Sequence, residues 1–97
     1  MNEIEMENYV DWHESVEWGT APTHGRYDEE DFAHAAAGNP LSYWDGVSVD
    51  LVPCTHLPTE TRALLAPTVV CVLVCDGYVY PLASWEELDS LQKEHQE

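Results

Sequence analysis

Two neighbouring segments near the C-terminus place the strongest constraint on the fold of this chain. Residues 68–75 form a run of mainly β-branched side chains, and residues 78–82 form a second apolar segment. Asp76 and Gly77 lie between them, and an Asp-Gly pair between two apolar strands is typical of a two-residue hairpin turn. Because the first strand is apolar along its length, we expect both of its faces to be covered. Pro81 cannot donate a ladder hydrogen bond, so we expect the second strand to lie at an edge or to end its pairing there.

The middle of the chain repeats this pattern. Residues 41–44 and 47–51 flank another Asp-Gly pair at 45–46, which predicts a second hairpin. In the second of these strands, apolar residues alternate with Ser48 and Asp50. This alternation is typical of a strand with one buried face, so Ser48 and Asp50 are expected on the exposed face.

Three segments carry helical signals. Residues 28–37 indicate a short helix that Asp28 caps and Gly38 ends, and residues 84–97 indicate a longer one with an apolar stripe. Within the proline-rich segment that follows the second hairpin, residues 59–65 are compatible with a single helical turn.

The N-terminal segment is ambiguous. Tyr9, Val10 and His13 approximate one face of a helix, whereas Val16 and Trp18 alternate as in a strand. We expect a helix in the first part and a strand from Val16.

These elements predict a small α+β fold with an antiparallel sheet built from two Asp-Gly hairpins, and with flanking helices at both ends of the chain. Residues 1–97 are expected to form one domain. Residues 1–31 are an acidic N-terminal segment, residues 32–83 carry the apolar core hairpins, and residues 84–97 form an acidic C-terminal helix.

The net charge is the most unusual property of the composition. The 97 residues include 19 acidic and 3 basic side chains, for a formal net charge of -16. A small domain usually carries a net charge of roughly 2–8 in magnitude. A larger net charge destabilises the folded state, because the like charges repel one another. The charge therefore indicates either a basic partner or a very salty medium. Direct binding to nucleic acid or to an anionic membrane is disfavoured, because both surfaces are negative.

The acidic residues are concentrated in residues 1–31, where four aromatic residues also lie. A line of carboxylates can imitate the phosphate row of a nucleic acid and occupy a groove rich in Lys and Arg. Aromatic side chains on such a surface supply binding energy at protein interfaces. The alternative is a solvated acidic face with its aromatic residues in the core. The residues expected to contact a partner are Glu3, Glu5, Glu7, Asp11, Glu14, Glu17, Asp28, Glu29, Glu30 and Asp31, together with Tyr9, Trp12, Trp18 and Tyr27.

Other kinds of site find little support in the sequence. Three cysteines, Cys54, Cys71 and Cys75, are an odd number for a disulfide framework, and we expect them to be reduced. Cys54 and His56 could supply two metal ligands or a nucleophile and its base, but there is no Cys-x-x-Cys pair and no evident third group. Phosphate-binding glycine loops and nucleophile elbows are absent from the sequence. We therefore expect no metal, no cofactor and no enzymatic activity.

The sequence thus predicts an acidic inhibitor that presents carboxylates to the basic nucleic-acid-binding site of a partner protein. Small proteins that counter restriction or CRISPR complexes have a similar size and charge. This similarity is one of general type, and it suggests a phage-encoded protein. One alternative is a structural or housekeeping domain of a halophile, and another is an acidic subunit or adaptor of a larger complex. Acids spread evenly over the surface would favour the halophile, and acids gathered on one face would favour the mimic. The first residues lack the features of a signal peptide, so we expect a cytoplasmic protein, in the host cell if it is phage-encoded.

Overall fold

A computed structural model describes residues 4–6, 9–19, 26–44, 48–75 and 77–95. Within these ranges the chain forms five strands, four α-helices and one short 3₁₀ turn. In chain order they are β1 (Ile4–Glu5), α1 (Tyr9–Ser15), α2 (Glu29–Ala36), β2 (Leu41–Trp44), β3 (Ser48–Pro53), the 3₁₀ turn (Cys54–His56), α3 (Thr59–Arg62), β4 (Cys71–Cys75), β5 (Tyr78–Leu82) and α4 (Trp85–His95).

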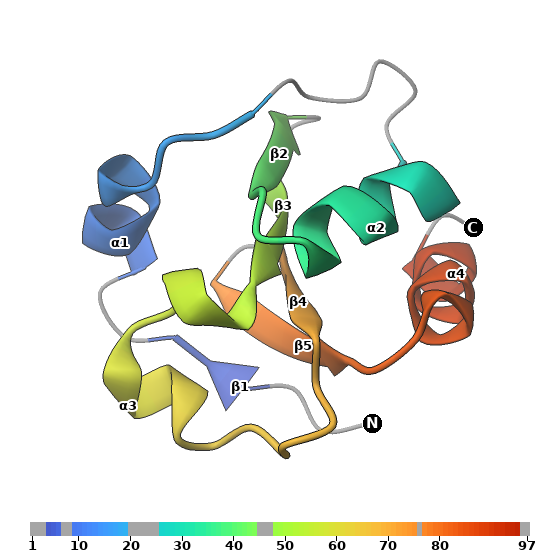
Figure 1. Cartoon of the computed structure of the whole chain (residues 1–97). Helices are drawn as coiled ribbons and strands as arrows, with labels where there is room; N and C mark the ends of the chain where they lie inside the picture. Colours follow the sequence, from blue (N-terminus) through green and yellow to red (C-terminus); the bar gives the residue numbers. More distant parts are fainter. Residues whose placement is uncertain (1–3, 7–8, 20–25, 45–47, 76, 96–97) are drawn as a thin grey trace.

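The strands form one antiparallel sheet in the order β1-β5-β4-β3-β2, with β4 at its centre (Figure 1). The α+β class with an antiparallel sheet is therefore confirmed. β5 pairs with β4 as far as Leu82, past Pro81, and β1 covers part of its other side. The predicted turn residues 45–46 and Asp76 lie outside the described residues.

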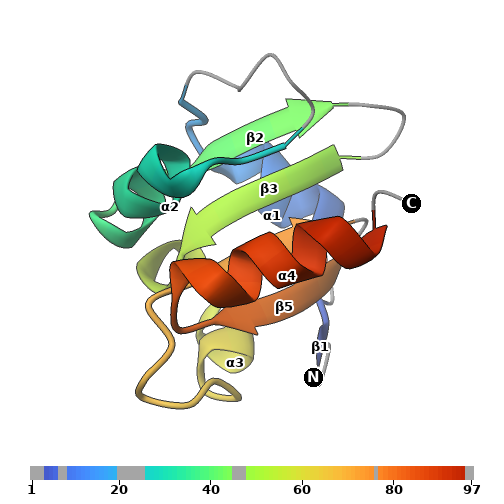
Figure 2. The same cartoon turned by 90° about the vertical axis from the view of Figure 1, so that its right-hand side faces the viewer.

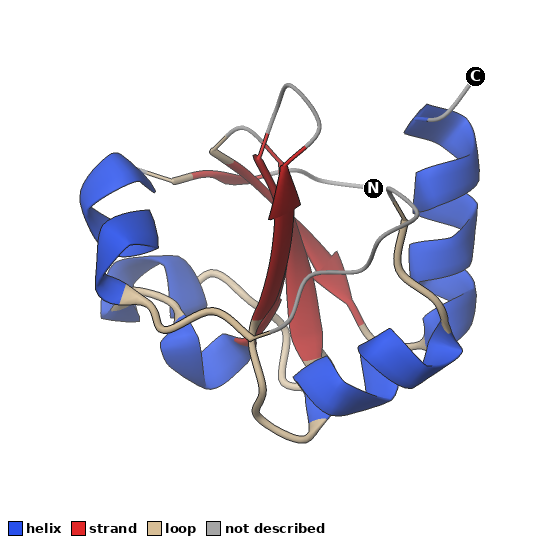
Figure 3. Ribbon diagram, turned by 90° about the horizontal axis from the view of Figure 1, so that it is seen from above, coloured by secondary structure: helices blue, strands red, loops and turns tan. Residues whose placement is uncertain are grey.

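Helices cover both faces of the sheet. α1 and α3 lie on one face and α2 and α4 on the other (Figure 3), and Figure 2 looks onto the α2 and α4 side with α1 behind the sheet. Successive residues of β4 point to opposite faces, so Leu73 packs with α2 and α4, whereas Val72 and Val74 pack on the α1 side. This arrangement confirms the expectation that both faces of the apolar strand are buried.

On the α2 and α4 face, α2 begins and ends as the sequence predicts, and α4 (Trp85–His95) lies within the predicted residues 84–97, of which 96–97 are outside the described residues. The carboxylate of Asp28 accepts a hydrogen bond from the backbone N–H of Asp31, and the carboxylate of Asp31 accepts one from the backbone N–H of Asp28. This reciprocal capping box starts α2. Gly38 follows its end with a φ of 110°, a conformation that favours glycine. In α4, the predicted stripe buries Leu88 and Leu91.

Tyr27 and Gln92 connect α4 to the segment that enters α2. The side-chain amide of Gln92 accepts a hydrogen bond from the Tyr27 N–H at 2.6 Å and donates one to the Tyr27 carbonyl at 2.8 Å. The Tyr27 hydroxyl donates to the carbonyl of Val49 on β3 at 2.7 Å. Tyr27 is completely buried, so the expectation that this ring contacts a partner is wrong, and the ring belongs to the core.

The N-terminal part of the chain differs from the prediction in two ways. The strand expected from Val16 does not form, because the chain folds back onto α1. The indole N–H of Trp18 donates to the carbonyl of His13 at 3.0 Å, and the two rings lie 4.9 Å apart. On α1 itself, Val10 was expected on the apolar face but is 64% exposed, and Trp12 is buried in its place.

Candidate functional site

The structure divides the predicted acidic contact residues between the two faces of the sheet. Asp11, Glu14 and Glu17 lie on α1 or directly after it, whereas residues 28–31 start α2 on the opposite face (Figure 3). All three acids of the first group are exposed. The described acids of these two groups therefore lie on opposite sides of the sheet.

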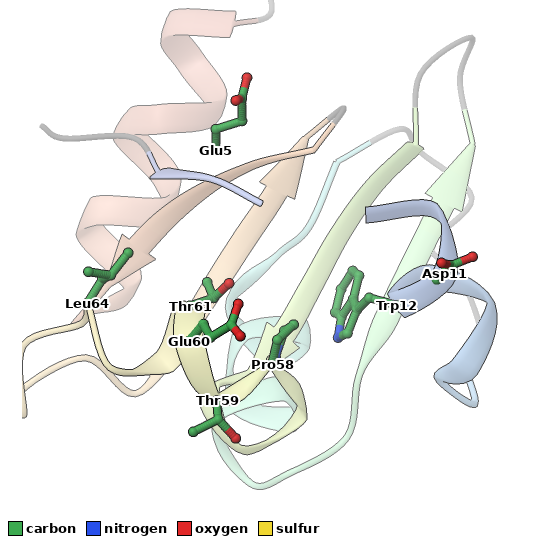
Figure 4. A pocket seen from close by; sticks show the side chains of 8 residues that line it. All are labelled: Glu5, Asp11, Trp12, Pro58, Thr59, Glu60, Thr61 and Leu64. Atoms are coloured by element: carbon green, nitrogen blue, oxygen red, sulfur yellow. The ribbon is translucent and has the colours of Figure 1, made fainter. Parts of the chain in front are cut away.

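The N-terminal row of Glu3, Glu5 and Glu7 is described only at Glu5. The residues on either side of it, Ile4 and Met6, pack into the core on the α1 and α3 face. Because side chains alternate along a strand, Glu5 points the other way. Figure 4 shows it on the opposite side of β1 from the side chains of α3. Glu3 and Glu7 lie outside the described residues.

The acids at the start of α2 partly serve their own helix. The hydrogen bond from the Asp31 backbone holds the pKa of Asp28 below its ordinary value, which is the expected effect of donors on a carboxylate. Burial raises the pKa of Asp31. Glu30 lies 3.7 Å from the imidazole of His34 one turn later. Asp28 and Asp31 therefore have a structural role that requires no partner.

The aromatic residues of α1 form a cluster against the sheet. Trp12 is 8% exposed, and its indole N–H donates to the carbonyl of His56 at 2.6 Å. Its ring lies 5.6 Å from that of Trp18, edge to face, and 6.0 Å from that of Tyr9. Tyr9 and Trp18 are partly exposed. Of the four predicted contact aromatics, these two remain the most accessible.

A groove of about 520 Å³ lies between β1, α1 and α3. Figure 4 shows Trp12 and Glu60 on either side of Pro58 within it. Asp11 and Glu60 contribute exposed carboxylates, and Leu64 contributes an apolar side chain that is 68% exposed. The full lining consists of Asp11, Trp12, Pro58, Thr59, Glu60, Thr61 and Leu64, together with Glu5 of β1, whose side chain extends to the other side of that strand (Figure 4).

The lining of this groove contains carboxylates but no basic side chain. Arg62 is the cation of α3; it is exposed and does not belong to the lining of the groove. Two other basic residues, Arg26 and Lys93, both lie beside Asp89 of α4, at 3.8 Å and 3.0 Å. The groove therefore combines an apolar wall with negative charge that the described part of the chain does not neutralise.

The sequence indicates only half of this site. Glu5, Asp11 and Trp12 were predicted because they lie in the acidic aromatic segment. Residues 58–64 were predicted only as a loop with one helical turn, since they contain a single acid and no recognisable motif. They become part of the groove through the sheet, which brings α3 beside α1.

A second unpredicted feature is the carboxylate of Asp50, which is completely buried on β3. The alternation in this strand predicted an exposed position, and that prediction is wrong because α1 covers this face. Asp50 accepts a hydrogen bond from Ser42 Oγ at 2.5 Å and one from Tyr9 Oη at 3.3 Å. The Nε2 of His13 lies 3.4 Å from it. These contacts fasten α1 to the sheet and so fix the wall of the groove that carries Trp12.

In the described parts of the chain, no group of three His, Cys, Asp or Glu side chains is placed to hold a metal ion. The three cysteines are free thiols. Burial raises the pKa of both Cys54 and Cys71. Among the helices that the structure describes, none has the length and apolar character needed to cross a membrane.

Comparison of the chain with protein-family models, with curated proteins and with solved structures gave no significant match.

Proposed function

We propose that this protein binds a basic surface of a partner protein and competes there with nucleic acid, as an acidic inhibitor without catalytic activity. The observation that supports this proposal is the charge that the fold leaves unneutralised. There are 19 acidic residues against 3 basic ones, and two of those three, Arg26 and Lys93, share one carboxylate. A basic partner would relieve the repulsion among the remaining carboxylates.

The mechanism is electrostatic and steric competition. Negative potential accelerates the encounter with a basic protein, and this steering weakens as salt screens the charges. Once bound, the small domain occupies the surface that nucleic acid would contact. Affinity then comes from the apolar and aromatic side chains beside the carboxylates, such as Leu64 and Trp18.

A second candidate function is that of a domain adapted to high salt, and the distribution of acids favours it. Exposed acidic residues lie on α1, on α2 and on α4, and so on both faces of the sheet. In such a protein the carboxylates hold water and cations, and no single basic partner is required.

A pull-down from cell lysate, treated with nuclease and run at low and high salt, tests the proposal. We expect a basic nucleic-acid-binding protein to be retained at low salt and released by added DNA or RNA. The control bait is an unrelated protein of similar size and net charge. Retention of the same proteins by both baits, or retention that nucleic acid does not reverse, contradicts competition. If nothing basic binds and folding requires molar salt, the second candidate is supported.

A further inference from the structure

We infer that the groove between β1, α1 and α3 is the docking point for the basic partner, and that its preferred occupant is an arginine side chain on an exposed segment of that partner. This inference rests on the proposed function and names the part of the surface that performs it. It selects one location from an acidic surface that extends over both faces of the sheet.

Charge complementarity is the first argument for a cationic occupant. Asp11 extends from α1 and Glu60 from α3, so the carboxylates come from two sides of one groove. Both are exposed, and the described residues place no cation within ion-pair distance of either. Figure 4 shows these two residues at opposite ends of the groove with Pro58 and Trp12 between them, so a cation bound beside either carboxylate meets no competing basic side chain in the lining.

The apolar part of the lining argues for arginine over lysine. Pro58 and Trp12 form an apolar wall on one side of Glu60, and the exposed Leu64 lies on its other side (Figure 4). A guanidinium is planar, weakly hydrated and able to donate several hydrogen bonds in fixed directions, so it packs on apolar surface while it binds carboxylate. The lysine ammonium is strongly hydrated, so it loses more hydration free energy when it contacts an apolar wall.

The size and rigidity of the groove suit a short segment of a protein. Its volume of about 520 Å³ is in the range of ligand-binding clefts, which is roughly 300–1,000 Å³. Its α1 wall is held by the buried Asp50 through Tyr9 and His13. A wall that is already fixed loses little entropy on binding.

The test is an NMR titration with a short amidated peptide of alternating arginine and glycine, compared with the corresponding lysine peptide. The indole N–H of Trp12 reports on the groove. We expect saturable shifts at Trp12 and Leu64, and tighter binding of the arginine peptide. The double variant D11N/E60Q should bind about tenfold more weakly, which corresponds to about 1.4 kcal/mol.

The matched control is the double variant E86Q/E94Q, which removes the same charge from exposed positions on α4. We expect it to change the affinity by less than about twofold, because the Debye length at physiological salt is about 8 Å. If both double variants weaken peptide binding equally, the groove is not the docking point. The same conclusion follows if the two peptides bind with equal affinity, or if the chemical-shift changes are spread over all acidic residues. In those cases the proposed function stands if the pull-down still recovers a displaceable basic partner. A wild-type protein that binds neither peptide and recovers no partner contradicts both.

Discussion

The thiol of Cys71 lies completely buried at the start of β4, in the core beneath α2 and α4. Burial raises its pKa from the ordinary value of 9.0 to about 12. In the unfolded chain the same thiol loses its proton near the ordinary value. The two states therefore bind different numbers of protons in alkaline solution, and folding becomes linked to pH there.

We predict that Cys71 resists alkylation in the folded protein at about pH 8.5 and reacts once the chain unfolds. The contribution of Cys71 to stability is fully present below about pH 9 and is lost as pH rises toward 12, because only the unfolded state releases the proton. Mass spectrometry after iodoacetamide treatment measures the reaction. The variant Cys71→Ser provides the control, since its alkaline stability should fall less steeply. Rapid labelling of Cys71 under native conditions would contradict its burial.

Single residues also mark the limit of prediction from sequence. Position 50 alternates with apolar neighbours as a solvent-facing residue does, and only the docking of α1 determines that this carboxylate is buried. Tyr27 stands next to four consecutive acids, yet it is fully buried. Its backbone N–H donates a hydrogen bond to the side chain of Gln92, and its hydroxyl donates one to the carbonyl of Val49. In both cases the deciding contact comes from a distant part of the chain.

At the scale of elements, α1 depends on a polar anchor as well as on its apolar side chains. Tyr9 and His13 reach Asp50 from the same face of this helix, and Ser42 reaches it from β2. α1 has only seven residues, and helices of this length have little stability of their own in water. Its position therefore depends on these contacts and on Trp12.

We predict that Asp50→Ala lowers the free energy of unfolding by about 2–3 kcal/mol, because two partly buried hydroxyl donors, Tyr9 and Ser42, lose their common acceptor. Urea unfolding followed by tryptophan fluorescence measures the change, since Trp12 lies on α1 and Trp18 packs against it. The exposed Asp11→Ala is the control and should change stability by less than about 0.5 kcal/mol. If the two variants unfold at the same urea concentration, Asp50 does not anchor the helix.

The elements with local signals are those that the sequence predicts correctly. The apolar pattern of β4 and the capping box of α2 both act within a few residues, and both are confirmed. β1 was not predicted, because its two residues become a strand only by pairing with β5 from the other end of the chain. The strand expected from Val16 is wrong because Trp18 packs against α1 instead.

Over the whole molecule, acidic residues occur on both faces of the sheet and on all four of the described α-helices, α1 to α4. With a net charge of -16, the folded state is opposed by long-range repulsion. Screening by salt reduces this repulsion, whichever function the charge serves. The shape of the salt dependence distinguishes the two candidate functions.

We predict that the melting temperature rises with added sodium chloride and levels off by about 0.3 M, where the Debye length falls to roughly 5–6 Å. Differential scanning calorimetry at increasing salt measures this dependence. A melting temperature that continues to rise through molar salt, more with sodium chloride than with an uncharged osmolyte, would indicate adaptation to a salty medium. That result would count against a partner as the reason for the charge.

The short N-terminal strand has a consequence for self-association. β1 pairs with β5 at Tyr78 and Val79, and Met6 adds a hydrogen bond to the Gly77 carbonyl at 2.8 Å. Further along β5, Pro81 has no N–H to offer a neighbouring strand. These two features limit the length of β5 along which another strand can pair. Shortening the chain by its first six residues would remove one of these safeguards, so purification tags and truncations are better placed at the opposite terminus.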